Sequence, residues 1–338
     1  MDCKVMRQVI ILAAFVINIV AASGASGQTL DVEAAKKEGK VIIYGTMVPK
    51  VMAEIEQGFL AKYGIKIEYW RADATKVIDR VLTEWRSGRP AFDVVTGARG
   101  AVALGKRDNV YAKFSPATAA KFPPKYRDPD GQLTAWRVTP VGVLYNTDMV
   151  KAADAPKTLD DLLDSRWAGK ISMPDPSVHA STAQYLWNLE QVKKEKWMDF
   201  VRALAKQKPL LQESYSTVPT AIVRGESALG ITYIQYAVQT KGPISFAPID
   251  KVFADPSDVA LSAKAINPNA AKVFIDYLCS PEGQKKVAET GEFVLAPGIF
   301  PAIKGADKVV ASMIVMNDIS AEQLAKIQGE FRPLFLSQ

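Results

Sequence analysis

Strand-like and helix-like segments alternate with short connections between residues 41 and 97. The order is strand, helix, strand, helix, strand, over residues 41–44, 51–60, 65–70, 77–85 and 92–95. Short connections of this kind imply a mostly parallel sheet, because parallel strands need a crossover that is usually a helix. The sequence therefore predicts an α/β fold in which helices cover the sheet.

Small or polar turns follow all three strands of this predicted sheet. In such sheets, ligands bind beyond the carboxyl ends of the strands. The turns contain Thr46, Met47, Arg71, Thr96, Gly97 and Arg99. The alternative for any single turn is that its glycine only shapes the backbone and its arginine only meets solvent. The three turns together predict a binding rim of amides, hydroxyl groups and guanidinium groups.

A second candidate site lies in the stretch 169–182, where a short strand runs into Asp-Pro. The two prolines of this stretch fix φ and remove backbone donors, so no helix can begin before Ser177. The turn that follows places Ser177, His179 and Ser181 beside the free amides of a helix expected to begin near Ser181. Polar ligands suit such a turn. The alternative is that Ser181 or Thr182 only caps the helix.

The rest of the chain again mixes strands and helices. Strands are predicted at 138–145 and 228–232, and helices at 159–163, 182–192, 196–206, 216–224, 270–278, 281–289, 308–315 and 321–328. Pro140 is expected near an edge, and Asn267-Pro268-Asn269 is expected to cap the helix at 270–278. Residues 110–136 are interpreted as a surface connection. Residues 244–263 are extended and proline-rich, which suits a crossing between two lobes.

The N-terminus has the three parts of a secretory signal peptide. A basic start is followed by a short apolar run and then by small residues. We predict a signal peptide over residues 1–27; a permanent N-terminal anchor is the alternative. Only Cys279 is left after its removal, so no intrachain disulfide is possible. An exported chain of this length is expected to form two lobes stabilised by a large core.

Charge gives little support to a polymeric ligand. The formal net charge of +6 is spread along the chain, with no basic run interleaved with aromatic residues. Nucleic-acid binding therefore has no support. A mild positive charge is compatible with small anions, although net charge alone is weak evidence.

Six short motifs occur in order across almost the whole mature chain. They are 41–46, 92–96, Gly142-Val143-Leu144-Tyr145-Asn146, Trp167-Ala168-Gly169-Lys170-Ile171 with Asp175-Pro176, Gly225-Glu226-Ser227-Ala228-Leu229-Gly230, and 267–284. In this order they resemble the extracellular solute-binding proteins of bacterial ABC importers. The resemblance is to the branch that includes ferric-ion, thiamine, polyamine and phosphonate binders.

The resemblance implies a two-lobed type II periplasmic-binding-protein fold. Each lobe would have a mixed, mostly parallel sheet flanked by helices, with the ligand in a cleft between the lobes. The lobes are expected to comprise 28–135 plus 255–303 and 136–254 plus 304–338. The implied protein is a periplasmic monomer without a cofactor that closes on a small solute and delivers it to the permease subunits in the inner membrane.

The resemblance also allows ferric iron to be compared with other ligand classes. Ferric binders of this branch typically use a His, a Glu and an adjacent Tyr pair, which here fall near Val48, near Ala98 and at Gln235-Tyr236. Only Tyr236 remains as an iron ligand, with possible help from Tyr233, which weakens the iron interpretation. Bound anions can replace protein ligands, so iron stays as the alternative.

The preferred ligand is a small organic anion such as a carboxylate or a phosphonate. Arg71 and Arg99 of one lobe are expected to face Ser177, His179, Ser181 and Tyr236 of the other. A purely structural role for His179 is an equal alternative. Removing either arginine is expected to weaken binding without unfolding the protein.

Two other classes of function are considered. An enzyme on the same fold could pair Cys279 with His179, but the two residues are expected in different lobes and no catalytic spacing is found. No enzymatic activity is therefore predicted. A periplasmic sensor subunit that passes its closed form to a receptor cannot be told from a transport protein by sequence.

Overall fold

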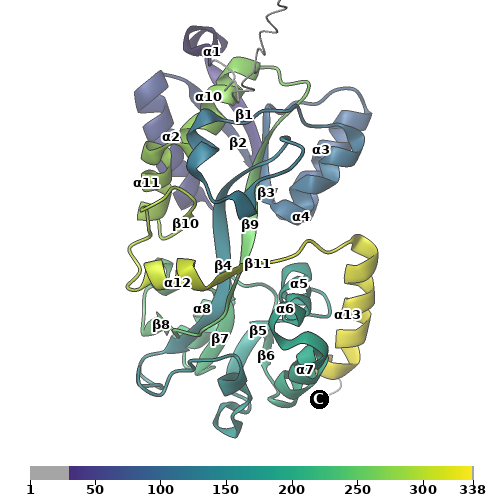
Figure 1. Cartoon of the computed structure of the whole chain (residues 1–338), viewed down its shortest axis with the longest axis vertical. Coiled ribbons are helices and arrows are strands. Elements are labelled where there is room, and N and C mark those ends of the chain that lie inside the picture. Colours follow the sequence, from purple (N-terminus) through teal and green to yellow (C-terminus); the bar gives the residue numbers. More distant parts are fainter. Residues whose placement is uncertain (1–29, 337–338) are drawn as a thin grey trace, which may run out of the picture.

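The computed structural model describes residues 30–336 and shows two α/β lobes stacked along the long axis (Figure 1). The predicted signal peptide, 1–27, lies outside the described residues. We call the upper lobe in Figure 1, which carries β1 to β3, the N-lobe and the lower lobe, which carries β5 to β7, the C-lobe. No helix in residues 30–336 is long and apolar enough to cross a membrane.

Within residues 30–336 the strands form one sheet, in the order β2-β1-β3-β9-β4-β7-β5-β6, with β8 and β10 paired to β4 and β11 paired to β9. The strands are β1 (Lys40–Gly45), β2 (Lys66–Arg71), β3 (Val94–Ala98), β4 (Thr134–Asn146), β5 (Ile171–Pro174), β6 (Leu210–Gln212), β7 (Leu229–Tyr233), β8 (Ile244–Phe246), β9 (Val252–Leu261), β10 (Phe293–Val294) and β11 (Met313–Val315). This mixed sheet confirms the predicted α/β class.

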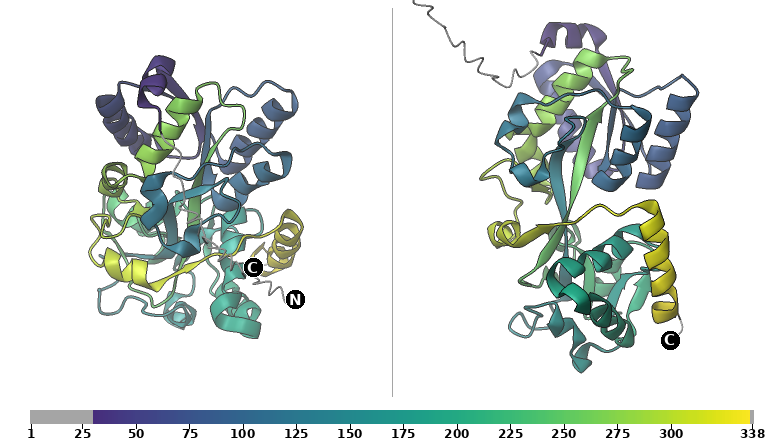
Figure 2. Two further views of the ribbon diagram at one scale, coloured as in Figure 1. Left: turned by 45° about the horizontal axis from the view of Figure 1, so that its top comes forward. Right: turned by 45° about the vertical axis from the view of Figure 1, so that its right-hand side comes forward.

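Helices flank the sheet in both lobes (Figure 2). The α-helices are α1 (Val32–Glu38), α2 (Pro49–Tyr63), α3 (Ala74–Arg86), α4 (Arg99–Val102), α5 (Ala180–Asn188), α6 (Glu190–Lys193), α7 (Trp197–Lys206), α8 (Val218–Val223), α9 (Tyr236–Gln239), α10 (Pro268–Cys279), α11 (Pro281–Glu289), α12 (Ala306–Ser312) and α13 (Ala321–Leu336). Short 3-10 helices are η1 (Ala103–Asp108), η2 (Ala117–Lys121), η3 (Pro124–Tyr126), η4 (Asp160–Leu163), η5 (Ser165–Trp167) and η6 (Lys194–Lys196).

The predicted parallel sheet of the N-lobe is confirmed. β1 pairs in parallel with both β2 and β3. Gly39 and Gly64 end α1 and α2 in the left-handed conformation that favours glycine. Gly45 at the end of β1 is needed for another reason: a Cβ there would lie 2.5 Å from Thr96 Cγ2 and 3.0 Å from the Thr96 carbonyl oxygen.

Two long strands, β4 and β9, join the lobes. They pair antiparallel from Thr134–Val259 to Val141–Phe253, with an irregularity between Ala135 and Arg137. β9 is an extended strand that runs between the lobes and is buried throughout, which confirms the expected crossing over the 252–261 part of residues 244–263 (Figure 1). The predicted lobe boundaries at 135/136 and 254/255 fall inside β4 and β9, and that at 303/304 falls between β10 and α12. The division of the chain at these residues stays a prediction.

Three sequence expectations are wrong in detail. Residues 110–136 are not a surface connection, because Tyr111, Phe122, Leu133 and Trp136 in this stretch are buried. Pro140 lies inside β4 rather than near its edge; the next residue begins the pairing with β7, and the carbonyl of Pro140 accepts from the amide of Ile234. The expected helix 308–315 ends at Ser312, and Met313–Val315 forms β11, parallel to β9.

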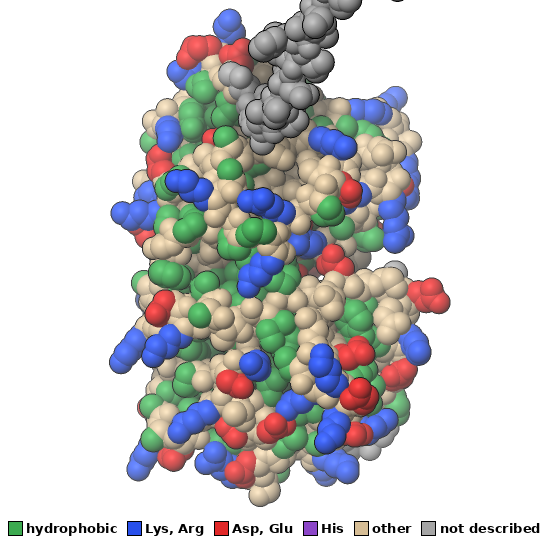
Figure 3. Space-filling view, in the orientation of Figure 1, with side chains coloured by type: hydrophobic (Ala, Val, Ile, Leu, Met, Phe, Trp, Pro, Cys, Tyr) green, Lys and Arg blue, Asp and Glu red, His purple; other side chains and the backbone are tan. Residues whose placement is uncertain are grey.

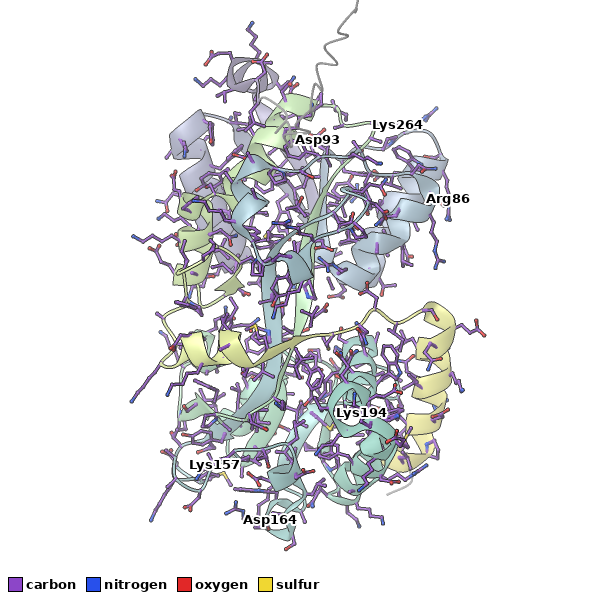
Figure 4. All side chains as sticks on the ribbon, in the orientation of Figure 1. Arg86, Asp93, Lys157, Asp164, Lys194 and Lys264 are labelled. Atoms are coloured by element: carbon purple, nitrogen blue, oxygen red, sulfur yellow. The ribbon has the colours of Figure 1, made fainter. Side chains whose placement is uncertain are left out.

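The helix at 268–279 is capped by residues far away in the sequence. The Asn267 side chain does not cap it; the Asn267 amide nitrogen donates to Asp93 Oδ1 and its side-chain amide to Asp93 Oδ2, both at 2.8 Å (Figure 4 labels Asp93). The carboxylate of Glu38 instead accepts from the amides of Asn269 and Ala270. Acidic groups suit a helix N-terminus because the backbone donors there are free. These contacts join α10 to α1 and to the start of β3.

Gly45→Ala should destabilise the protein by about 1–3 kcal/mol, because the added methyl group must displace Thr96 and the backbone beside it. Gly329→Ala is the matched control. Gly329 is exposed inside α13, and no atom lies within 4 Å of the added Cβ. Alanine there should therefore raise the free energy of unfolding by about 0.5–1 kcal/mol. Urea unfolding measures both free energies. Equal effects of the two substitutions would contradict the close packing of β1 on β3.

Candidate functional site

The carboxyl ends of the parallel strands in both lobes meet at the lobe junction. In the N-lobe, β1, β2 and β3 end at Gly45, Arg71 and Ala98 on one sheet edge. In the C-lobe, β5 pairs in parallel with β6 and β7, so Pro174 and Tyr233 also share an edge. Both edges lie where β4 and β9 cross between the lobes (Figures 1 and 2). The predicted site residues therefore come from both sides of one junction.

The turns after β1 and β3 are closely packed. Met47 is fully buried, and its carbonyl oxygen accepts from the Tyr69 hydroxyl at 2.9 Å. Thr96 is also buried, and its Oγ1 accepts from Trp136 Nε1 at 3.1 Å. The side chain of Thr46 is half-buried beside Gly97. Because the Met47 and Thr96 side chains belong to the core, only the half-buried Thr46 presents a hydroxyl group from these turns.

The two predicted arginines have different surroundings. Arg99 holds Asp258 with two hydrogen bonds, from Nε to Oδ2 at 2.8 Å and from Nη2 to Oδ1 at 3.0 Å, and Nη2 also donates to the Tyr126 carbonyl oxygen at 2.6 Å. The guanidinium group of Arg99 is thus already hydrogen-bonded to groups of the protein. Arg71 is exposed at the end of β2, and no acidic partner is found for it among residues 30–336.

The residue that caps the helix after β5 differs from the expected one. The helix α5 begins at Ala180, and its N-cap is His179 rather than Ser181 or Thr182. His179 Nδ1 accepts from the Thr182 amide at 3.3 Å and lies 2.8 Å from Thr182 Oγ1. Burial lowers the pKa of His179, which keeps the ring neutral and Nδ1 able to accept. The single histidine therefore has a structural role in this turn.

Two serines of the same turn remain available to a ligand. Ser177 is buried, and its Oγ has no hydrogen-bond partner among residues 30–336. Ser181 lies half-buried in the first turn of α5. A buried hydroxyl group without a partner is uncommon because desolvation costs free energy. This makes Ser177 Oγ a candidate ligand contact, near the Ala180 and Ser181 amides that begin α5.

Aromatic rings connect this turn to the end of β7. The ring centroids of His179 and Tyr215 are 5.1 Å apart, those of Tyr215 and Tyr233 are 4.5 Å apart, and those of Tyr233 and Tyr236 are 5.9 Å apart. Burial and, to a smaller extent, Glu292 raise the pKa of Tyr236 to about 12, against the lowering effect of Arg137 and Arg71. The influence of Arg71 shows that the end of β2 lies near this C-lobe tyrosine.

Several charged residues at the junction were missed by the sequence analysis. Arg137 of β4 and Glu292 form a buried ion pair, from Nη1 to Oε2 at 2.6 Å, and Gln239 of α9 donates to Glu292 Oε1 at 3.2 Å. Asp255 lies in β9, opposite Thr139. Tyr215 was also missed, because β6 has only three residues and was not predicted. Two carboxylates, Asp255 and Asp258, within the otherwise mostly apolar extended run 252–261 were the signal for Asp255.

Comparison with known proteins identifies the kind of site. Residues 90–314, more than half of the chain, match the family model for bacterial extracellular solute-binding proteins. The chain belongs to this family. This solute-binding protein is accordingly the periplasmic binding component of an ABC transporter, and its family and relatives are transport-binding proteins.

Three similar proteins illustrate the range of the family. The probable ABC transporter periplasmic-binding protein y4fP of Sinorhizobium fredii is 29% identical over 36% of this chain, and the match spans only 34% of that relative. The Fe(3+)-binding periplasmic protein of Serratia marcescens is 23% identical over 79% of this chain and 81% of its own. The structure of AfuA from Actinobacillus pleuropneumoniae with fructose-6-phosphate bound has a TM-score of 0.66 at 18% identity, covering 88% and 97% of the two chains. The structural likeness confirms the two-lobed type II fold.

Arg99→Ala should lower the free energy of unfolding by about 3–5 kcal/mol, because it leaves Asp258 buried without its partner. This corrects the expectation that Arg99 could be removed without loss of stability. Arg89→Ala is the control: Arg89 is exposed in the loop before β3, and its removal should change stability by less than about 0.5 kcal/mol. Chemical denaturation of both variants tests the difference, and a fully stable Arg99→Ala protein would contradict it.

Asp255→Asn should stabilise the protein at neutral and alkaline pH. Burial, Asp318 and Asp258 raise the pKa of Asp255 to about 7 from its ordinary value near 4, against the lowering effect of Arg99 and Arg137. The folded state thus holds a proton that the unfolded state releases, so wild-type stability falls as pH rises between these values. The advantage of the variant should be small near about pH 4 and reach about 2–4 kcal/mol by about pH 8. A pH-independent difference in urea unfolding would contradict this assignment.

Proposed function

We propose that this solute-binding protein captures a small organic anion, carrying a carboxylate, phosphate or phosphonate group, at the lobe junction. The observation that carries the proposal is the exposed guanidinium of Arg71, which has no acidic partner among the described residues and lies near Tyr236 of the other lobe. A guanidinium group presents several donors in a planar fork that matches carboxylate and phosphate oxygens.

Groups of the C-lobe complement Arg71. At the start of α5 the amides of Ala180 and Ser181 have no hydrogen-bond partner among the described residues, whereas those of Thr182 and Ala183 donate to His179, and Ser177 Oγ is buried in the preceding turn without a partner. Tyr233 and Tyr236 are half-buried, and their phenol groups stay protonated at neutral pH because burial raises both pKa values. Protonated hydroxyl groups donate to anionic oxygens. The N-lobe contributes Thr46 and Arg71, and the C-lobe contributes Ser177, Ser181, Tyr233 and Tyr236.

The relatives support an oxygen-rich ligand. AfuA is named with fructose-6-phosphate bound, which is a phosphorylated organic anion. On the face of this protein shown in Figure 3, basic and acidic side chains are interspersed over both lobes, which fits recognition of a small solute better than of a polymer. We further propose that the protein is monomeric, needs no cofactor and uses β4 and β9 as the hinge on which it closes for the permease.

Ferric iron is the second candidate, favoured by the series Tyr215, Tyr233 and Tyr236 and by the iron-binding relative. Ferric iron prefers phenolate and carboxylate oxygens. Burial opposes it here, because a phenolate must form where the pKa values of all three tyrosines are raised. Val48 and Ala98 stand at the positions expected for a His and a Glu. Within residues 30–336, no group of three or more His, Cys, Asp and Glu side chains is placed to hold a metal.

A catalytic role receives no support from the only cysteine of the described residues. Cys279 is fully buried at the end of α10, and burial raises the pKa of its thiol well above the ordinary value. His179 lies at the start of α5, in the other lobe, where its Nδ1 is engaged by Thr182. The nucleophile pair considered from the sequence is therefore not assembled. A sensor subunit would use the same binding site and differs only in the partner of the closed form.

Arg71→Ala should weaken binding of organic anions by about tenfold or more, equivalent to ~1.4 kcal/mol, without loss of stability. Arg71→Lys should lose less, because it keeps the charge but not the fork. The control is Arg89→Ala, an exposed arginine of the same lobe. A thermal-shift screen of sugar phosphates, dicarboxylates, tricarboxylates and alkylphosphonates, followed by calorimetry of the hits, measures the affinities.

Two outcomes would contradict the proposal. Unchanged affinity of Arg71→Ala for every anion that binds the wild type would remove Arg71 from the site. The second outcome is a protein that binds none of these anions but binds a ferric salt. The visible absorption band of an iron–phenolate complex, lost in Tyr236→Phe, would then establish the iron interpretation instead.

A further inference from the structure

A pocket of the C-lobe is lined by residues other than the predicted ligand contacts at the lobe junction. It has a volume of about 430 Å³ and lies between α5, α6, η6 and the start of α7, with Asn317 of the segment after β11 as a further lining residue. Small-molecule sites commonly have volumes in this range. Figure 4 labels Lys194, one of its exposed lining residues. The lining comes from C-lobe helices and from a segment hydrogen-bonded to them, so the pocket is complete without the N-lobe.

Two tryptophan rings form the apolar part of this pocket. Trp187 of α5 and Trp197 at the start of α7 both line it, and both are half-buried. Trp197 packs against Phe331 of α13, with 6.4 Å between the ring centroids, whereas no ring contact is found for Trp187 within residues 30–336. An indole combines a broad apolar face with one N–H donor. The alternative is that both rings only cover the core on which they pack.

The polar part of the pocket is held by a network of amides. Asn188 is buried, and its Oδ1 accepts from the Asn317 amide at 2.6 Å and from Gln191 Nε2 at 2.7 Å. The Asn188 side-chain nitrogen donates to the carbonyl oxygens of Gln184 and Asn317. Gln191 Nε2 also donates to the Val315 carbonyl oxygen at 3.1 Å. The side chain of Gln191 is thus fixed through its nitrogen, and its Oε1 is left as an acceptor without a donor among the described residues.

The charged residues of the pocket are not paired with one another. Glu190, Lys194 and Glu195 are exposed, and no ion pair is found for any of them within residues 30–336. The adjacent Lys193 is used elsewhere, because its Nζ contacts Asp160 Oδ1 at 2.5 Å. Two carboxylates against one ammonium group disfavour the anions proposed for the lobe junction.

Free donors and free acceptors occur together in this pocket. The donors are the ammonium group of Lys194 and the two indole nitrogens, for which no hydrogen bond is found within residues 30–336; the acceptors are the two glutamates and Gln191 Oε1. An organic cation would satisfy only the acceptors. Hydroxyl groups both donate and accept, so a polyhydroxylated ligand satisfies both kinds of group.

The backbone at Lys194 is a second sign of a ligand site. Lys194 has φ 51° and ψ −135°, in the left-handed half of the φ range that favours glycine. Such a conformation costs about 1–3 kcal/mol and is found preferentially at functional sites. Here it forms the turn between α6 and η6, which brings Lys194 and Glu195 to the pocket.

We propose that this pocket binds a neutral saccharide. The apolar C–H face of a sugar ring lies against the indoles of Trp187 and Trp197, and its hydroxyl groups bond to Gln191 Oε1 and to the carboxylates of Glu190 and Glu195. The saccharide is a second ligand, distinct from the transported solute. Because the site belongs to one lobe, it is the same in the open and the closed protein, and the inference does not depend on the proposed function.

The test uses the mature chain with isotope-labelled indole nitrogens, titrated with cellotriose, maltotriose and triacetylchitotriose. Of the six indole N–H resonances, those of Trp187 and Trp197 should shift and saturate with at least one trisaccharide. High salt should not change the affinity, because the ligand is uncharged. Trp187→Ala should weaken binding by about tenfold, and Trp187→Phe should lose less because it keeps an aromatic face.

Two further variants keep the test independent of folding defects. Glu190→Ala changes an exposed side chain and should also weaken binding of the trisaccharide. The matched control is Trp85→Ala in the N-lobe, where a half-buried indole has Lys264 Nζ at 4.5 Å from its ring centroid. This variant should keep the affinity of the wild type.

Four results would overturn the saccharide site. They are indole resonances that none of the three trisaccharides moves, resonances that choline chloride moves in their place, an affinity that survives in both Trp187→Ala and Glu190→Ala, and binding that is lost in Arg71→Ala. The third would leave the pocket without a role in binding, and the last would place the saccharide at the lobe junction. Organic anions that fail to bind the wild type would contradict the proposed function and leave this site standing.

Discussion

The antiparallel pairing of β4 with β9 is the constraint on which the rest of the structure depends. These strands belong to both lobes at once, and their residues are buried along almost the whole crossing. Because β3 pairs with β9 and β7 pairs with β4, each lobe builds its sheet outward from the same pair. The strand ends of the two lobes are thus held at one junction, and a small change of angle along the crossing moves one set of ends relative to the other.

Much of the architecture could be predicted because it depends on local patterns. The spacing of apolar residues over 41–97 located three strands and two helices, and the short connections required a parallel sheet. The rule that ligands bind beyond strand ends pointed to Arg71, and the resemblance to ferric binders pointed to Tyr236; both stay predicted ligand contacts. Apolar spacing failed as a guide where a segment is buried by residues far away in the sequence. Residues 110–136 have no periodicity of their own, yet Trp136 is buried because distant segments cover it.

The roles of individual side chains could not be predicted to the same depth, because their partners are far away in the sequence. Arg99 and Arg71 look alike in the sequence, but Asp258 reaches one of them and not the other. His179 was identified as a possible ligand contact, yet its ring closes the N-terminus of α5. A histidine cap has no strong sequence signature, since Ser, Thr, Asp and Asn are the residues usually found there. Only three-dimensional contacts separate a positioned side chain from a free one.

The proposed ligand contacts lie on both lobes and so connect binding to closure. A ligand shifts the protein to its closed form only by the difference in its affinity for the two forms. Arg71 stands at the end of β2 in the N-lobe, whereas Ser177 and Tyr236 belong to the C-lobe. An anion that touches both edges would therefore be bound fully only when the two edges approach each other. Contacts divided in this way would favour the loaded closed form, which is what delivery to a permease requires.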